Sequence, residues 1–188
     1  MTKKIVITGG LGYIGTELCK IYSGESWRNQ ITVIDNRFVS ERVNQLRNWG
    51  INFVHADIRD SEKIKNFLKE ADTIHHLAGI TDVARTKEET NQDKDNEMND
   101  VAEKGTSIVL HESSKNCKII FPSTHVVFEG IQKMEEDIEE NSKKFPVLSY
   151  GIGKDKNEEQ IKKSGKNYII LRLASVYGYS TDTMRLNI

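Results

Sequence analysis

A glycine-rich turn lies close to the beginning of the chain, in the sequence Thr8-Gly9-Gly10-Leu11-Gly12-Tyr13-Ile14-Gly15. It follows residues 4–8, whose centre is three β-branched apolar residues, and this pattern predicts a short buried strand. Apolar side chains then recur at positions 14, 18, 21 and 22, the spacing of an amphipathic helix. A strand, a glycine turn and a helix in this order are typical of a doubly wound α/β domain.

The three spaced glycines of this turn have separate roles. Gly9 permits a tight turn, Gly12 lets the backbone approach a bound phosphate, and Gly15 lets the helix lie close to the strand. The N-terminus of the helix then faces the pyrophosphate of a dinucleotide. The spacing is also compatible with a turn that binds nothing, so the prediction of a dinucleotide site depends on residues further along the chain.

Strand patterns alternate with helix patterns along all 188 residues, a length that corresponds to one domain. Further strands are expected over 30–35, 51–57, 72–79, 118–121 and 168–172. Helices are expected around 39–49, 64–68, 98–109 and 149–164, with Ser61 as an N-cap and Pro122 as the end of a strand. Polar stretches at 80–96 and 133–144 are expected to be loops, the first of them a loop or lid that leads into a helix. The alternation predicts an α/β fold, a doubly wound parallel sheet of the Rossmann type.

Charge and composition exclude several classes of function. The net charge of -1 gives no reason to expect nucleic acid or an anionic membrane as a partner. No apolar run approaches the roughly 20 residues that span a bilayer, and the chain goes directly into a strand, so a cytoplasmic location is expected. Cys19 and Cys117 are too few for a disulfide framework and are expected to be buried. The five histidines lack a metal-ligand spacing, so no metal is expected.

Acidic and small residues follow three of the predicted strands at their carboxyl ends, where ligands of parallel sheets bind. Asp35, 20 residues after Gly15, is placed to accept hydrogen bonds from ribose hydroxyls and to repel a 2′-phosphate, which favours NAD over NADP. Arg37 slightly weakens this preference for NAD, because an arginine can bind a 2′-phosphate. Asp57 is placed at the adenine edge, and the small residues 77–79 leave room beside a cofactor.

A second group of residues suits proton transfer. Tyr150 and Lys154 are four residues apart, so they share one face of the helix predicted over 149–164. A free tyrosine has a pKa near 10, and a neighbouring ammonium lowers it, which makes Tyr150 a candidate general acid or base. Thr124, at the end of the fifth strand, offers a hydroxyl for the same substrate oxygen, whereas Ser123 is expected to be structural.

In this order and spacing, the motifs resemble those of the extended short-chain dehydrogenase/reductase family, in its NAD-dependent nucleotide-sugar epimerase/dehydratase branch. Residues 8–15 match the T-G-G-x-G-Y-I-G pattern of that branch closely. The other matching pieces are Asp57-Ile58, His76-Leu77-Ala78-Gly79, Gly105-Thr106, Ser123-Thr124, Tyr150 to Lys154, and Arg172 with Val176-Tyr177-Gly178. The resemblance covers essentially the whole chain.

The resemblance implies that the chain binds NAD and acts on a nucleotide sugar. It implies Tyr150 as the catalytic base, Lys154 as its electrostatic helper and a ligand of the nicotinamide ribose, and Thr124 as the hydroxyl partner. In this family a hydride passes from a sugar carbon to NAD while the tyrosine takes the hydroxyl proton. The implied cofactor contacts are Gly9, Gly12, Tyr13, Ile14, Asp35, Asn36, Asp57, Ile58, Leu77, Ala78, Gly79 and Lys154.

The sequence departs from the family pattern at several places. His125 and Val126 stand where the similar dehydratases carry an Asp-Glu pair, so a 4,6-dehydratase is disfavoured and an epimerase is expected. Ala102 stands where the family usually has Asn, and Asn99 lies one turn earlier on a similar helix face. The stretch 123–130 resembles the S-T-D-Y-V-F-D-G of dTDP-4-dehydrorhamnose reductases, which keeps a reductase as an alternative.

Members of this branch usually continue well beyond the place where this sequence stops. The resemblance therefore predicts that residues 1–188 are an NAD-binding Rossmann domain, the N-terminal part of a longer enzyme, with the C-terminal substrate subdomain largely absent. A truncated NAD-binding module without catalysis is the other alternative, although Tyr150 and Lys154 are retained. The family also pairs the helices near 97–114 and 149–164 across a two-fold axis, so a homodimer is expected.

Overall fold

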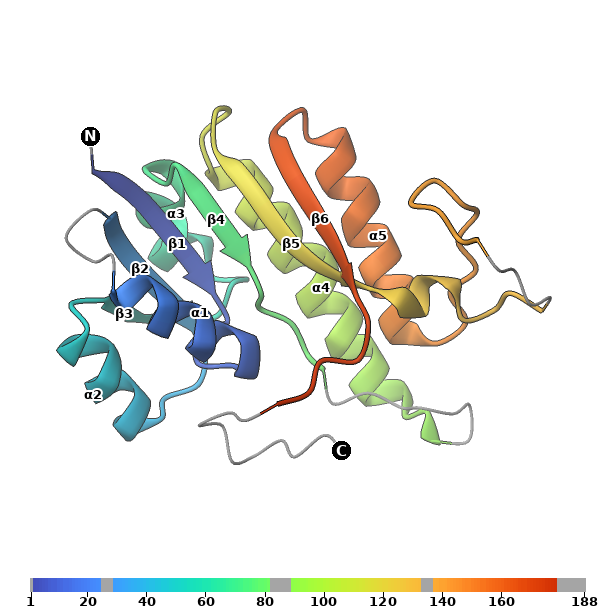
Figure 1. Cartoon of the computed structure of the whole chain (residues 1–188), viewed down its shortest axis with the longest axis horizontal. Coiled ribbons are helices and arrows are strands. Elements are labelled where there is room, and N and C mark those ends of the chain that lie inside the picture. Colours follow the sequence, from blue (N-terminus) through green and yellow to red (C-terminus); the bar gives the residue numbers. More distant parts are fainter. Residues whose placement is uncertain (1, 25–28, 82–88, 133–136, 179–188) are drawn as a thin grey trace.

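The computed structural model describes residues 2–24, 29–81, 89–132 and 137–178. They form a six-stranded parallel sheet with helices on both of its faces (Figure 1). The strands are β1 (Lys3–Thr8), β2 (Asn29–Asp35), β3 (Asn52–His55), β4 (Thr73–His76), β5 (Lys118–Thr124) and β6 (Asn167–Leu173). The helices are α1 (Tyr13–Ser23), α2 (Ser40–Asn48), α3 (Ser61–Lys69), α4 (Gln92–Glu112) and α5 (Ser149–Lys163), with a short 3-10 helix η2 (His125–Phe128). The predicted α/β class is confirmed.

The strand order is β3-β2-β1-β4-β5-β6, and every neighbouring pair is parallel. All carboxyl ends therefore meet at one edge of the sheet. The order reverses between β1 and β4, and ligands of open α/β sheets bind in the crevice that such a reversal creates. The fold thus brings the ends of β1, β2, β4 and β5 to one place, as the sequence predicted.

Each face of the sheet has its own hydrophobic core. On one face Ile7 of β1 packs in a cluster with Cys19 of α1 and Val43 of α2. On the other face Val6 belongs to a cluster that includes residues of α3, α4 and α5, among them Val109. Adjacent residues of a strand point to opposite faces, so the β-branched run in β1 supplies both cores.

Two sequence predictions about element ends were wrong. Pro122 does not end β5, because the strand continues to Thr124 in register with β6. At Pro122, β5 has already passed the end of β4, whose pairing stops at Ile120, so a residue without an N–H is tolerated there. Ser61 is not the N-cap of α3: the Asp60 side chain accepts a hydrogen bond from the Lys63 amide and occupies that position.

Helices α4 and α5 pack side by side behind β5 and β6 (Figure 1). Lys156 of α5 forms an ion pair with Glu103 of α4, and Ile161 is completely buried between helix and sheet. These are the two helices that the sequence predicted to pair with a second copy, and that pairing stays a prediction.

Strand β6 forms one edge of the sheet and is covered on one side only. Arg172 faces α5, whereas Ile169 and Leu171 on the opposite face are nearly half exposed. In the described part of the chain no helix lies in front of them (Figure 1). Of the helices that the structure describes, none has the length and apolar character needed to cross a membrane.

Candidate functional site

The glycine turn connects β1 to α1 at the carboxyl edge of the sheet. Gly9 has a φ of +71°, and a Cβ there would lie 2.7 Å from the amide nitrogen of Ala78. A Cβ on Gly15 would lie 2.5 Å from the carbonyl oxygen of Gly9. Gly12 is the N-cap of α1, and no side chain caps this helix end. Backbone N–H groups at an uncapped helix N-terminus form an anion site, so the turn fits a pyrophosphate.

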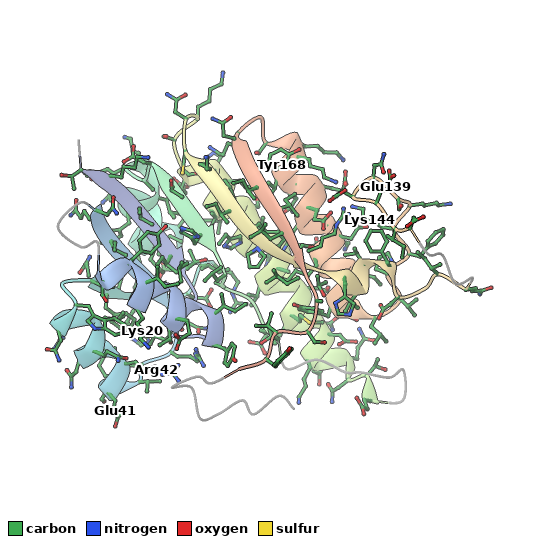
Figure 2. All side chains as sticks on the ribbon, in the orientation of Figure 1. Lys20, Glu41, Arg42, Glu139, Lys144 and Tyr168 are labelled. Atoms are coloured by element: carbon green, nitrogen blue, oxygen red, sulfur yellow. The ribbon has the colours of Figure 1, made fainter. Side chains whose placement is uncertain are left out.

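Asp35 is buried at the end of β2, directly beside this turn. Its carboxylate accepts hydrogen bonds from the amides of Leu11 and Arg37, each at 2.9 Å. The Arg37 guanidinium lies 3.5 Å from the same carboxylate, and Arg42 of α2 donates to the Leu11 carbonyl. Arg42 lies beneath α1 in Figure 2. The carboxylate is therefore fixed beside the turn, and its predicted role as a ribose ligand stays a prediction.

Asn36, Tyr13 and Ile14 lie around the same turn. The Asn36 carbonyl accepts a hydrogen bond from His55 Nε2, and Ile14 is about one third exposed at the start of α1. The Tyr13 hydroxyl donates to the carbonyl of Gly178, at 2.7 Å. This bond brings the segment that follows β6 close to the glycine turn. The sequence did not predict that these two segments lie together.

Asp57 follows β3 and is held by an arginine that sequence reasoning did not single out. Arg59 donates to its carboxylate through Nε and Nη2, and also to Asp100 of α4. These hydrogen bonds hold the pKa of Asp57 below its usual range. Ile58 is buried against α4, where a Cβ on Gly105 would lie only 2.2 Å from its Cδ1. The residues that follow β3 are therefore held against α4 by hydrogen bonds and close packing.

Leu77, Ala78 and Gly79 leave β4 next to the glycine turn. The Leu77 amide donates to the carbonyl of Thr8, and the Ala78 amide donates to the Thr8 hydroxyl. A Cβ on Gly79 would meet nothing within 4 Å. These residues lie at the carboxyl ends of β1 and β4, where the strand order reverses, and the space for a cofactor beside them stays a prediction.

A buried histidine of β4 connects β1 to α4. His76 lies 2.9 Å from Thr8 Oγ1 through Nδ1 and 3.0 Å from Thr106 Oγ1 of α4 through Nε2. Burial, together with the charge of Lys154, lowers the pKa of His76 to about 3. The neighbouring His75 points to the opposite face, where Tyr22 of α1 bonds its Nε2. The two histidines thus serve opposite faces, as the strand period predicts.

The neutral His76 makes stability depend on pH. Below pH 6.5 the unfolded chain protonates this histidine and the folded chain does not, so stability is complete above pH 6.5 and falls as the pH decreases. The loss due to His76 is about 2 kcal/mol at pH 5. Urea denaturation at pH 5 and at a pH above 6.5 gives the free energy of unfolding at each. The difference between these two free energies should be smaller for His76→Asn than for the parent chain. His111 is largely exposed, and His111→Asn should keep the parental difference. An equal difference in all three proteins would contradict this role.

Thr124 and its neighbours form the end of β5. Thr124 is buried, and its hydroxyl oxygen accepts the amide of Val126, which starts η2 and leaves the hydroxyl hydrogen able to donate elsewhere. Ser123 donates to Glu158 at 2.6 Å, which agrees with the structural role expected for it. His125 is exposed and lies 3.2 Å from the carbonyl of Leu173, through Nδ1.

Tyr150 and Lys154 lie one turn apart in the first half of α5. The Lys154 ammonium donates to the Pro122 carbonyl at 2.8 Å and lies 4.5 Å from the centroid of the Phe121 ring. It is 5.8 Å from the centroid of the Tyr150 ring. Burial lowers the pKa of Lys154 to about 8, against the opposing effect of Glu158. A partly desolvated ammonium thus lies between the tyrosine and the end of β5.

Glu158 is the main residue of the site region that sequence reasoning missed. It is completely buried in α5 and accepts hydrogen bonds from Ser123, Arg172 and Lys144. Burial acts to raise its pKa, but the hydrogen bonds from Arg172 and Ser123 outweigh it and lower the pKa to about 2. Its position four residues after Lys154, on the same helix face, was the available signal.

Together, the fold and these residues define a Rossmann-type domain of the extended short-chain dehydrogenase/reductase class. The family model described as the RmlD substrate binding domain matches residues 3–186, and the chain belongs to that family.

Named relatives agree with this family. A Methanocaldococcus jannaschii protein provisionally named UDP-glucose 4-epimerase is 31% identical over 95% of this chain and 57% of its own length. CDP-paratose 2-epimerase of Salmonella typhi is 24% identical over 97% of this chain and 56% of its own length. UDP-glucose 4-epimerase of Thermotoga maritima, solved with UDP-glucose, is 25% identical with a TM-score of 0.79, over 95% of this chain and 57% of that one. The chain thus spans little more than half the length of these relatives.

Proposed function

We propose that this chain supplies the NAD-binding and proton-transfer half of a nucleotide-sugar epimerase. The observation that carries the proposal is the placement of Lys154, whose ammonium lies between Tyr150 and the end of β5 at the carboxyl edge of the sheet. The same edge holds the uncapped N-terminus of α1 and the fixed carboxylate of Asp35. A dinucleotide site and an acid/base pair at one edge are what hydride transfer from an alcohol requires.

The residues present fit NAD in three respects. The glycine turn leads into a helix N-terminus that no side chain caps, which suits a pyrophosphate. Asp35 offers a carboxylate for ribose hydroxyls and disfavours a 2′-phosphate, although Arg37 stands beside it. Gly79 leaves open space next to the crevice. The full proposed set is Gly9, Gly12, Tyr13, Ile14, Asp35, Asn36, Asp57, Ile58, Leu77, Ala78, Gly79 and Lys154.

In the proposed reaction, bound NAD would accept a hydride from a sugar carbon and return it. Tyr150, as phenolate, takes the proton of the sugar hydroxyl when the hydride leaves and gives it back when the keto group is reduced. Lys154 favours the phenolate through its positive charge. Thr124 donates its hydroxyl hydrogen to the same sugar oxygen, since its own oxygen is already engaged by the Val126 amide.

A reductase is the second candidate, because the matching family model is the RmlD substrate binding domain. The stretch 123–130 is also similar to that of dTDP-4-dehydrorhamnose reductases. Such an enzyme would use the same Tyr150 to protonate a keto sugar as the hydride arrives.

Absorbance at 340 nm separates these functions in the 188-residue chain. An epimerase should form NADH when NAD is mixed with a UDP-, GDP- or dTDP-sugar, and the epimer should appear in the products. A reductase should instead consume NADH only with a keto sugar. Calorimetry that detects NAD binding but no sugar binding, with no change in absorbance, would favour a non-catalytic module or a fragment, and calorimetry that detects no NAD binding would contradict both functions.

A further inference from the structure

Two consecutive residues of β5 are bonded to two side chains of α5. Lys154 donates to the Pro122 carbonyl, and one turn later Glu158 accepts the Ser123 hydroxyl at 2.6 Å. The next residue along β5 is Thr124, and Tyr150 lies one turn before Lys154 in α5. These two bonds therefore fix how the end of β5 lies along α5, and with it the separation of Thr124 from Tyr150.

Glu158 is also the buried counter-charge of this region. Its side chain is 0% exposed, and Arg172 of β6 binds it through Nε at 2.9 Å and Nη2 at 2.8 Å. Lys144, from the loop before α5, lies 3.3 Å from the same carboxylate, and Lys162 of α5 lies at 3.7 Å. Figure 2 shows Lys144 beside α5. One carboxylate thus faces cations from a strand, a loop and its own helix.

Lys154 lies four residues before this carboxylate, on the same face of α5. The charged and titratable groups that act on it are Glu158 and Tyr150 of its own helix and His76 of β4, which stays neutral. Burial opposes the ammonium form, whereas the charge of Glu158 favours it, as do the Pro122 carbonyl and the two aromatic rings beside the ammonium. If Glu158 were neutral, Arg172 would lose the carboxylate that it binds, whereas Lys144 would keep Asp155 and Glu159 as partners.

We propose that Glu158 is a positioning residue for the group Thr124, Tyr150 and Lys154: its bond to Ser123 holds the end of β5 against α5, and its carboxylate is the buried counter-charge of the layer that contains Lys154. This role rests on the proposed function. A purely stabilising role explains less, because a buried ion pair contributes little net stability compared with apolar residues of the same size.

The test uses three substitutions in the 188-residue chain. Glu158→Gln keeps the shape and the acceptor for Ser123 but removes the charge. Ser123→Ala removes the bond to β5 and leaves the ion pairs. Glu159→Gln is the matched control, because Glu159 also contacts Lys144 and Lys162 but its side chain is nearly half exposed. Thermal melting establishes which variants are folded.

The first readout needs no turnover. In protein labelled with 13C at lysine Cε, NMR follows the titration of Lys154, which is assigned by its loss in Lys154→Arg. We expect the titration midpoint to fall by about one pH unit in Glu158→Gln, and to stay at the parental value in Ser123→Ala and Glu159→Gln. An unchanged midpoint in Glu158→Gln overturns the counter-charge role, even if the parent chain converts no nucleotide sugar and the proposed function fails.

The second readout is kinetic. With an active parent, we expect Glu158→Gln and Ser123→Ala each to lower kcat by about tenfold or more while KM for the sugar changes little, because a misplaced acid/base pair affects the transition state. Glu159→Gln should keep the parental kcat. If Glu158→Gln does not fold, Ser123→Ala carries this readout alone, and a parental kcat in Ser123→Ala overturns the positioning role.

Discussion

Replacing Tyr150 with phenylalanine is expected to abolish NADH formation from a nucleotide sugar while NAD still binds. The substitution removes one hydroxyl and leaves the ring beside Lys154 in place. General acid–base groups contribute about 100-fold to 10,000-fold to a rate, so kcat should fall by at least about 100-fold. Stopped-flow absorbance at 340 nm gives the rate, and calorimetry with NAD gives the affinity, which should remain close to that of the parent.

Tyr168→Phe is the matched control for this experiment. Tyr168 is partly exposed in β6, near the amino end of the strand and far from the carboxyl edge of the sheet (Figure 2). Removing the Tyr168 hydroxyl should leave the rate of NADH formation at the parental value. A Tyr150→Phe protein that forms NADH as fast as Tyr168→Phe would exclude Tyr150 as the base, and with it the proposed mechanism.

The sequence predicted those parts of the site that depend on local pattern. The glycine spacing placed a turn between β1 and α1, and parallel topology then brought Asp35 to the edge where that turn lies. The four-residue spacing of Tyr150 and Lys154 placed both on one helix face. These inferences succeed because a strand end and a helix face are fixed by a few neighbouring residues and by general rules of topology.

The parts that were missed depend on contacts between distant segments. In the sequence Glu158 is one of many charged residues of α5, and its burial arises only when β5, β6 and the loop before α5 pack around it. Arg59 likewise acquires its role by reaching α4. The missing N–H of Pro122 predicts a strand end, but whether a missing N–H matters there depends on where the pairing with β4 stops. No local pattern contains such information.

The second large effect is expected for Gly9→Ala. Gly9 has a φ of +71°, a backbone conformation that costs an L-residue about 1 to 2 kcal/mol. A methyl group there would also lie 2.7 Å from the amide nitrogen and 2.8 Å from the Cα of Ala78, both backbone atoms that cannot rotate away. Relieving such a contact costs roughly 1 to 3 kcal/mol more. We expect unfolding in urea to show a loss of about 3 kcal/mol in total.

Gly50→Ala separates the two causes, because Gly50 has nearly the same φ, +69°, and no atom within 4 Å of the position of its Cβ. It should lose only the conformational part, about 1 to 2 kcal/mol, and bind NAD like the parent. Gly9→Ala should bind NAD at least about tenfold more weakly, because pushing Ala78 outward disturbs the carboxyl ends of β1 and β4, where the proposed dinucleotide site lies. If the two variants were equally stable and bound NAD equally well, the close contact at Gly9 would have no consequence, and the glycine turn would not be part of a dinucleotide site.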